Sequence, residues 1–310
     1  MGETDTDAAD QFDARISTTK LDEGTPELWR RYRKLPRNVF AISLVSLLND
    51  TSSEIIYPLL PAFLYLTLGA SPAVVGLIEG AAESVSSLLK LFSGYFSDRR
   101  GRRKAFVVFG YSLANLVRPL LAFATSWYQV FAIRLTDRIG KGIRSAPRDA
   151  LIADTVSPEE RGLAFGFHRA MDHAGAVIGP LIGYLLLRLF AADHNSPAAH
   201  DYSRVFLIAS IPALAAVIVA AFFVREPRKK VHANSDPFSA PPRLSLRGFD
   251  GNFKRFLVII ALFTLSNSSD AFLLLRAQTL GFSVTTIMLL WAMLHVSKVA
   301  IFQTDWDGVV

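Results

Sequence analysis

The stretch Gly94–Lys104, GYFSDRRGRRK, joins two apolar segments and carries one acid and five bases in its last seven residues. Cytoplasmic loops of membrane proteins are enriched in Lys and Arg, which accounts for the bases. This enrichment does not account for Gly94, Asp98 and Gly101. A glycine permits close helix contact or a tight turn, and an acid can pair with a base or sit at a helix N-terminus. The stretch therefore predicts a shaped connection between two membrane helices.

The composition agrees with a membrane protein. Of 310 residues, 51% are hydrophobic and 19% are charged, whereas a soluble domain carries about 25% charged residues. The run 206–224 holds no charge and the run 105–124 holds only Arg118, and about 20 apolar residues cross a bilayer core. The chain has no cysteine, which excludes disulfides and thiolate metal sites. Bases that flank the membrane account for the net charge of +6 better than nucleic acid binding does.

Apolar segments and basic loops together predict the topology. We expect eight membrane helices, near 38–67, 73–97, 105–124, 127–146, 160–189, 204–224, 256–280 and 284–303. The fourth is too polar for a hydropathy scan, but counting it places every basic segment (30–37, 99–104, 144–161 and 225–255) on one side. The sequence thus predicts a multi-pass protein of the cytoplasmic (inner) membrane with both termini in the cytoplasm.

The chain divides at a polar segment that is rich in Pro, Ser and bases. We expect a cytoplasmic tail with a basic interfacial segment (1–37), a six-helix bundle (38–224), a cytoplasmic linker (225–255), two further helices (256–303) and an atypical tail (304–310). The two parts echo each other, since NDTSSEIIYPLL at 49–60 resembles SNSSDAFLLLRA at 266–277. Glu54 and Asp270 align in this repeat, each about 15 residues and roughly 22 Å into its helix at 1.5 Å per residue. Parallel repeats about the membrane normal would place them at similar depth, facing one central space.

Three motifs resemble those of the major facilitator superfamily. The opening stretch is similar to the signature between helices two and three, whose residues here are Gly94, Asp98, Arg99, Gly101, Arg102 and Arg103. The small residues of the predicted fifth helix look like the family's antiporter motif, at Gly175, Gly179, Pro180 and Gly183. Small residues every four positions permit close helix packing, and proline loosens the backbone for bending. RIGKGIRSA at 138–146 is similar to the helix-four motif to which proton transfer is attributed, but Lys141 stands where Gln is usual.

The resemblance implies an all-α membrane fold of twelve helices in two six-helix bundles, around a cavity that opens alternately to either side. This chain would supply the complete first bundle and two helices of the second. A second copy of the loop signature is due near 306–316, and the tail IFQTDWDGVV does not resemble it, so we expect a truncated or frame-shifted sequence. In the family the loop acid meets the start of helix eleven, so we expect Asp98 to lack that partner here.

Charges inside the predicted helices are the candidate site, because each charge at the bilayer centre costs about 2.5–3.5 kcal/mol unless it has partners or water. Adjacent carboxylates one turn apart, such as Glu79 and Glu83, repel when both are ionised and therefore suit proton coupling. His168 titrates near neutral pH without special help. The candidates for substrate binding or proton coupling are Asp50, Glu54, Glu79, Glu83, Arg134, Arg138, His168, Arg169, Asp172, Asp270 and Arg276.

The leading hypothesis is a proton-coupled antiporter that exports a small organic molecule, with the bilayer, the substrate and protons as its partners. A second is uptake or exchange of an organic anion, favoured by Arg134, Arg138, Arg169 and Arg276. A third, from another class, is a non-transporting sensor or scaffold derived from a transporter. We find no nucleophile with a base and no nucleotide-binding motif, so the sequence predicts neither an enzyme nor a cofactor. His168 and His173 make only a weak case for a metal, and none is predicted.

Overall fold

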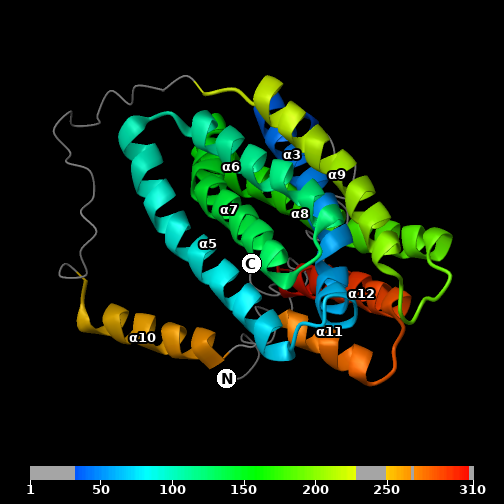
Figure 1. Ribbon diagram of the computed structural model, residues 1–310. Helices are drawn as coiled ribbons and strands as arrows, with labels where there is room; N and C mark the ends of the chain where they lie inside the picture. Colours follow the sequence, from blue (N-terminus) through cyan, green and yellow to red (C-terminus); the bar gives the residue numbers. More distant parts are fainter. Residues whose placement is uncertain (1–31, 228–248, 267–268, 307–310) are drawn as a thin grey trace, which may run out of the picture.

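The computed structural model describes residues 32–227, 249–266 and 269–306, which form a bundle of helices (Figure 1). The first helix, α3 (Arg37–Ile56), continues through η1 (Tyr57–Leu59), α4 (Leu60–Ala62) and η2 (Phe63–Thr67). Then come α5 (Pro72–Arg100), α6 (Arg103–Val117) with its extension η3 (Arg118–Phe123), and α7 (Trp127–Thr155). The turn η4 (Pro158–Glu160) leads into α8 (Arg161–Phe190), and α9 (Ala199–Phe222) follows. After the linker come α10 (Gly251–Ser266), α11 (Asp270–Thr279) and α12 (Val284–Trp306).

Local sequence signals account for several helix boundaries. Ser71 accepts a hydrogen bond from the Val74 N–H and Pro72 follows at the first helical position, which begins α5. The same helix ends at Gly101, whose φ of 62° is left-handed and favours glycine. The tight turn predicted at Gly101 is therefore present. Within the first helix, Pro58 lacks an N–H, and the backbone there tightens into the turn η1.

Glycines bring the central helices unusually close. A Cβ on Gly175 would lie 2.6 Å from the carbonyl oxygen of Leu47, and one on Gly179 would lie 2.7 Å from that of Thr51. At Gly183 an added Cβ would collide with the Cε atom of Met288. The close helix packing expected of the motif is therefore present, and its partners are α3 and α12. α8 continues as one helix through Pro180.

The apolar surface of the bundle suits a bilayer. In the part of the chain that the structure describes, five helical stretches are long and apolar enough to cross a membrane: Arg37–Thr67, Pro72–Arg100, Arg103–Phe123, Pro158–Phe190 and Ala199–Phe222. Large apolar side chains such as Leu189, Phe222 and Phe263 are exposed on the outside. As anticipated for the fourth predicted helix, α7 is not among these apolar stretches, although its 29 residues make it as long as α5.

Two predicted helices differ from the structure. The helix predicted at 127–146 continues to Thr155, because Leu151 and Ile152 are fully buried in the cluster that contains Val39 and Ile42. The single helix predicted at 256–280 is two helices, since α10 ends at Ser266 and α11 begins at Asp270 with Ser269 as its N-cap. Asp270 therefore opens a helix and does not lie mid-helix like Glu54. α10 lies apart from the bundle, and its side chains at 251–264 are all exposed (Figure 1).

Several predictions lie outside the described residues. These are the polar tail at 1–31, most of the linker (228–248) and the final residues 307–310.

Candidate functional site

A cavity of about 560 Å³ lies among α3, α7, α8, α11 and α12, with Lys90 of α5 also at its wall. Among the described residues, nine Lys or Arg and six Asp or Glu side chains line it, together with His295. The bases are Lys90, Arg118, Arg134, Arg138, Lys141, Arg144, Arg148, Arg169 and Lys298, and the acids are Asp50, Glu54, Asp137, Asp149, Asp172 and Asp270. So polar a lining inside a bundle with an apolar exterior is typical of a path for polar solutes.

Arg118 stabilises one end of the cavity wall through a network of buried contacts. Its Nε donates to Asp137 Oδ1 at 2.9 Å, and the guanidinium also donates to the Asn115 side chain at 2.7 Å and the Asn49 carbonyl at 3.1 Å. Arg118 and Asp137 are both buried, and such a pair is stable only when its remaining polar atoms are also satisfied. These contacts tie η3 to α3 and α7.

Arg134 and Glu79 form a two-pronged ion pair between α7 and α5. Arg134 Nε and Nη2 donate to the two oxygens of Glu79 at 2.9 and 3.1 Å. The guanidinium also lies 5.0 Å from the centre of the Tyr57 ring, a cation–π contact. Glu79 does not line the cavity itself. Glu79 fixes the position of Arg134, which does line the cavity.

The wall formed by α12 contacts both repeat acids. Trp291 Nε1 donates to Glu54 at 2.8 Å, and His295 Nε2 lies 3.7 Å from the same carboxylate oxygen. Lys298 Nζ lies 3.7 Å from Asp270 Oδ2. Glu54 and Asp270 both line the cavity. Thus Glu54 links the first six-helix segment to the segment that follows the linker.

On α8 the predicted residues separate into two groups. Arg169 and Asp172 line the cavity, where Arg169 Nη1 lies 4.0 Å from Asp172. His168 is buried behind them, with Nδ1 3.4 Å from the Ser43 hydroxyl and Nε2 3.7 Å from Asp172. Among the described residues, no cluster of three or more His, Asp or Glu side chains forms a metal site.

The structure thus brings seven of the predicted candidates to one cavity: Asp50, Glu54, Arg134, Arg138, Arg169, Asp172 and Asp270. Glu79 and His168 lie directly behind it. Glu83 and Arg276 are exposed and not part of its lining. The proposed pair of adjacent carboxylates is therefore divided, because Glu79 faces α7 whereas Glu83 lies on an exposed face of α5.

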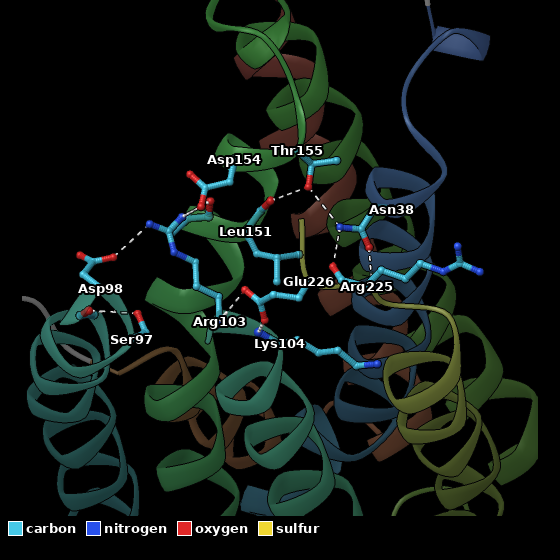
Figure 2. A network of polar contacts seen from close by, with 12 residues as sticks. Asn38, Ser97, Asp98, Arg103, Lys104, Leu151, Asp154, Thr155, Arg225 and Glu226 are labelled. Carbon is cyan, nitrogen blue, oxygen red and sulfur yellow. Dashed lines mark hydrogen bonds and ion pairs between the residues drawn. The ribbon is translucent and has the colours of Figure 1, made fainter. Parts of the chain in front are cut away.

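The predicted loop motif forms part of a polar network at one end of the bundle (Figure 2). Arg103 lies 3.2 Å from Asp98 and 2.5 Å from Asp154 of α7, and it donates to the Ala150 carbonyl at 2.6 Å. Glu226, just beyond α9, accepts from the backbone N–H groups of Arg103 and Lys104 at 3.0 and 2.7 Å. A carboxylate at this position satisfies two otherwise free donors at the start of α6.

Asn38 extends this network to α3. Its side chain donates to Thr155 at 3.1 Å and exchanges two hydrogen bonds with the backbone of Arg225, at 3.0 and 2.8 Å (Figure 2). The ends of α3, α5, α6, α7 and α9 are therefore joined by polar contacts. Arg99 and Arg102 of the motif are exposed, and Gly94 lies beneath the loop, where an added Cβ would be 3.3 Å from Ala146 Cβ.

Sequence reasoning missed several residues of both sites. The helix predicted at 284–303 was recognised by its apolar residues alone, and it carries Trp291, His295 and Lys298. In the sequence, only the alignment of Glu54 with Asp270 indicated that this part of the chain contributes to the site. Arg148 and Asp149 lie in the part of α7 that was read as a loop. Asp154 and Glu226 are ordinary acids in basic segments, and nothing in their local sequence indicates a contact with Arg103.

Comparisons with known proteins agree with this architecture. The sequence model of the Major Facilitator Superfamily matches residues 42–302. The chain is 35% identical to the uncharacterised MFS-type transporter MJ1317 of Methanocaldococcus jannaschii over 246 residues, which are 79% of this chain and 58% of the relative. It is 34% identical over 134 residues to the multidrug resistance protein MdtH of Photorhabdus laumondii, covering 43% of this chain and 33% of the relative.

Solved transporters share the fold. A bacterial homologue of the human lysosomal transporter Spinster, inward-facing and unoccupied, has a TM-score of 0.60 at 21% identity, over 88% of this chain and 60% of that one. A D-xylose–proton symporter also has a TM-score of 0.60, at 15% identity, over 87% of this chain and 69% of that one. The chain spans 58% of the length of the MJ1317 transporter and 33% of the length of the MdtH protein. Since the family's sequence model covers most of it, the chain belongs to the Major Facilitator Superfamily.

Proposed function

We propose that this protein is a secondary transporter of the cytoplasmic membrane that moves a small organic solute by alternating access. The observation that carries the proposal is the charged cavity, which is enclosed jointly by helices before the linker and helices after it. Relative movement of two such groups of helices around a fixed central site is how alternating access operates. The Glu54–Trp291 hydrogen bond crosses between these groups.

Proton-coupled export is the mode that we favour within this proposal. Glu54 lines the cavity close to His295, so a proton on either group would change a contact between the two groups of helices. Some relatives are named multidrug resistance protein MdtH, a name that fits export. The glycine motif of α8, which lies against Glu54 at Gly179, is the antiporter-like motif of the sequence.

Flux into proteoliposomes under an imposed pH gradient tests the proposal. The labelled probes are matched in size and differ in charge: gluconate, glucose and glucosamine, and the aromatic set benzenesulfonate, benzamide and benzylamine. Antiport moves a probe against the proton flow and symport moves it with the flow. We expect gradient-driven flux of at least one probe, lost in Glu54→Gln and retained in Glu83→Gln, whose carboxylate lies outside the cavity.

Two results would contradict parts of the proposal. Flux that follows the proton flow would replace export by symport. Flux of every probe equal to that of empty liposomes, under every gradient, would favour the non-transporting scaffold or sensor.

A further inference from the structure

The middle of α7 is fixed between two neighbouring helices by glycines on either side of Lys141. A Cβ on Gly140 would lie 2.5 Å from the Gly110 carbonyl oxygen of α6, and one on Gly142 would lie 2.7 Å from the Ser86 carbonyl oxygen of α5. Side chains larger than hydrogen would force these helices apart. Because the glycines on either side face α6 and α5, Lys141 faces neither, and it lines the cavity.

Lys141 stands in a stripe of bases along α7. Arg134, Arg138 and Lys141 follow one another at spacings of four and three residues, and Arg144 continues the series after three more. Residues at these spacings share one face of a helix. All four line the cavity. Arg134 is paired with Glu79, whereas the other three bases have no ion pair among the described residues.

No carboxylate lies within ion-pair distance of Arg138, Lys141 or Arg144 in the part of the chain that the structure describes. Arg138 Nε and Arg144 Nη1 are buried and have no acceptor among these residues. Asp50 and Glu83 attract Lys141 electrostatically, but neither forms an ion pair with it in the described part of the chain. The guanidinium of Arg144, a residue only 5% exposed, lies 4.3 Å from the centre of the Tyr111 ring.

Five of the six cavity acids contact residues other than Arg138, Lys141 and Arg144. Asp137 binds Arg118, Asp149 binds Arg148, Asp172 contacts Arg169, and Asp270 contacts Lys298. Glu54 accepts from Trp291. Asp50 forms no ion pair among the described residues: its carboxylate accepts from the side-chain amide of the neighbouring Asn49 at 2.8 Å, and it attracts Arg144 and Lys141 from beyond ion-pair distance. Counted over the described residues, the lining is positive by three charges, nine bases against six acids, and most of its bases lie on α7.

Buried cations without a counter-charge are unfavourable, and an anion that enters the cavity would relieve this cost. We infer that Arg138, Lys141 and Arg144 form a binding site for the anionic group of the transported solute, an organic carboxylate, sulfonate or phosphonate. This inference rests on the proposed transport function and gives its substrate a chemical class. Guanidinium groups bind such oxyanions through two parallel hydrogen bonds, and the Lys141 ammonium adds a third donor group.

The substitution Lys141→Gln is the sharpest test, because it installs the residue that is usual in the resembling motif and keeps a polar side chain of similar length. Isothermal titration of the detergent-solubilised protein would measure the binding of gluconate, glucose, glucosamine, benzenesulfonate, benzamide, benzylamine and inorganic sulfate. We expect the wild-type protein to bind at least one organic anion, and to bind it at least tenfold more tightly than its neutral and cationic counterparts and than sulfate.

The variants separate a role in binding from a role in folding. Since a charge-assisted hydrogen bond is strong, Lys141→Gln and Arg144→Gln should each weaken anion binding on the order of tenfold or more. Lys141→Arg should retain most of the binding. Lys254→Gln, an exposed base on α10, is the matched control and should bind as the wild type does. Size-exclusion profiles and Tm values identify any variant that misfolds. If Lys141→Gln misfolds, the anion binding of Lys141→Arg is compared with that of the wild type instead.

Several outcomes would overturn the inference. They are equal binding of the charged and neutral probes, sulfate binding as tight as the best organic anion, and anion binding unchanged in Lys141→Gln. Failure here is distinguishable from failure of the transport proposal. Gradient-driven flux of neutral or cationic probes alone would retain transport and reject the anion site. Anion binding without flux would retain the site and reject transport.

Discussion

Glu79 and Glu83 show how two identical residues one turn apart on a helix acquire different roles. Glu79 accepts two hydrogen bonds from Arg134, and both partners are almost completely buried. Glu83 is exposed on the same helix and has no ion pair among the described residues. Periodicity placed both on one face of α5, but only the position of α7 decides which of them faces a base. The local sequence holds no information on that position.

Glu79→Gln should lower stability by up to about 3–5 kcal/mol, because it removes the two-pronged pair and leaves the buried Arg134 guanidinium with the longer, 3.7 Å contact to Asp137, a carboxylate that Arg118 already binds. Glu83→Gln, the matched control, should change stability by no more than about 0.5 kcal/mol. Thermal unfolding of the two variants in detergent measures the difference. Equal Tm values would show that the buried pair contributes nothing to stability.

At the scale of helices, the sequence predicted most of the arrangement. Apolar runs located the spans, and basic loops indicated that the polar α7 should be counted among the helices. The division of 256–280 into α10 and α11 could not be predicted, since an N-cap such as Ser269 looks like any other serine in a Ser-rich segment. The length of α7 was missed because the bases at 144–161 indicate a loop, whereas burial of Leu151 and Ile152 holds them in a helix.

The close contact of α8 with α3 predicts opposite effects of one substitution at two glycines. Gly179→Ala places a Cβ 2.7 Å from the Thr51 carbonyl oxygen, and such overpacking should destabilise the protein by about 1–3 kcal/mol. Gly166→Ala, in the same helix, meets no atom within 4 Å and should stabilise it by up to about 1 kcal/mol. Thermal unfolding checks the sign of each change. A stabilising Gly179→Ala would contradict the close packing.

The network at the loop between α5 and α6 also gives a prediction. Asp98 is 59% exposed, so its pair with Arg103 should contribute no more than about 1 kcal/mol. Arg103 makes the larger set of contacts, to Asp98, Asp154 and the Ala150 carbonyl. We therefore expect Arg103→Gln to loosen the loop more than Asp98→Asn does.

A reporter cysteine at Ser97, which is fully buried beneath this loop, measures the loosening. Its rate of thiol labelling should rise most in Arg103→Gln, less in Asp98→Asn and not at all in Arg99→Gln, whose side chain is exposed. If Asp98→Asn had the largest effect, the acid rather than Arg103 would be the centre of the network.

At the scale of the whole molecule, the predicted topology places the basic segments on the cytoplasmic side. The native chain has no cysteine, so single cysteines report the side directly. An impermeant thiol reagent added outside intact cells should label Thr125→Cys and Ser196→Cys, which lie in the links of the opposite side. It should not label Arg102→Cys, an exposed position between α5 and α6. Labelling of Arg102→Cys from outside would reverse the orientation.

Alternating access is the central claim, and a cysteine in the cavity tests it most directly. Ser53 of α3 lines the cavity, whereas Ser210 of α9 is buried away from it and serves as the control. Ser53→Cys in proteoliposomes should react with an impermeant thiol reagent from either side of the membrane, and reversing the pH gradient should change which side reacts faster. Ser210→Cys should stay unlabelled. Labelling of Ser53→Cys from one side only, at a rate that no gradient changes, would contradict the claim.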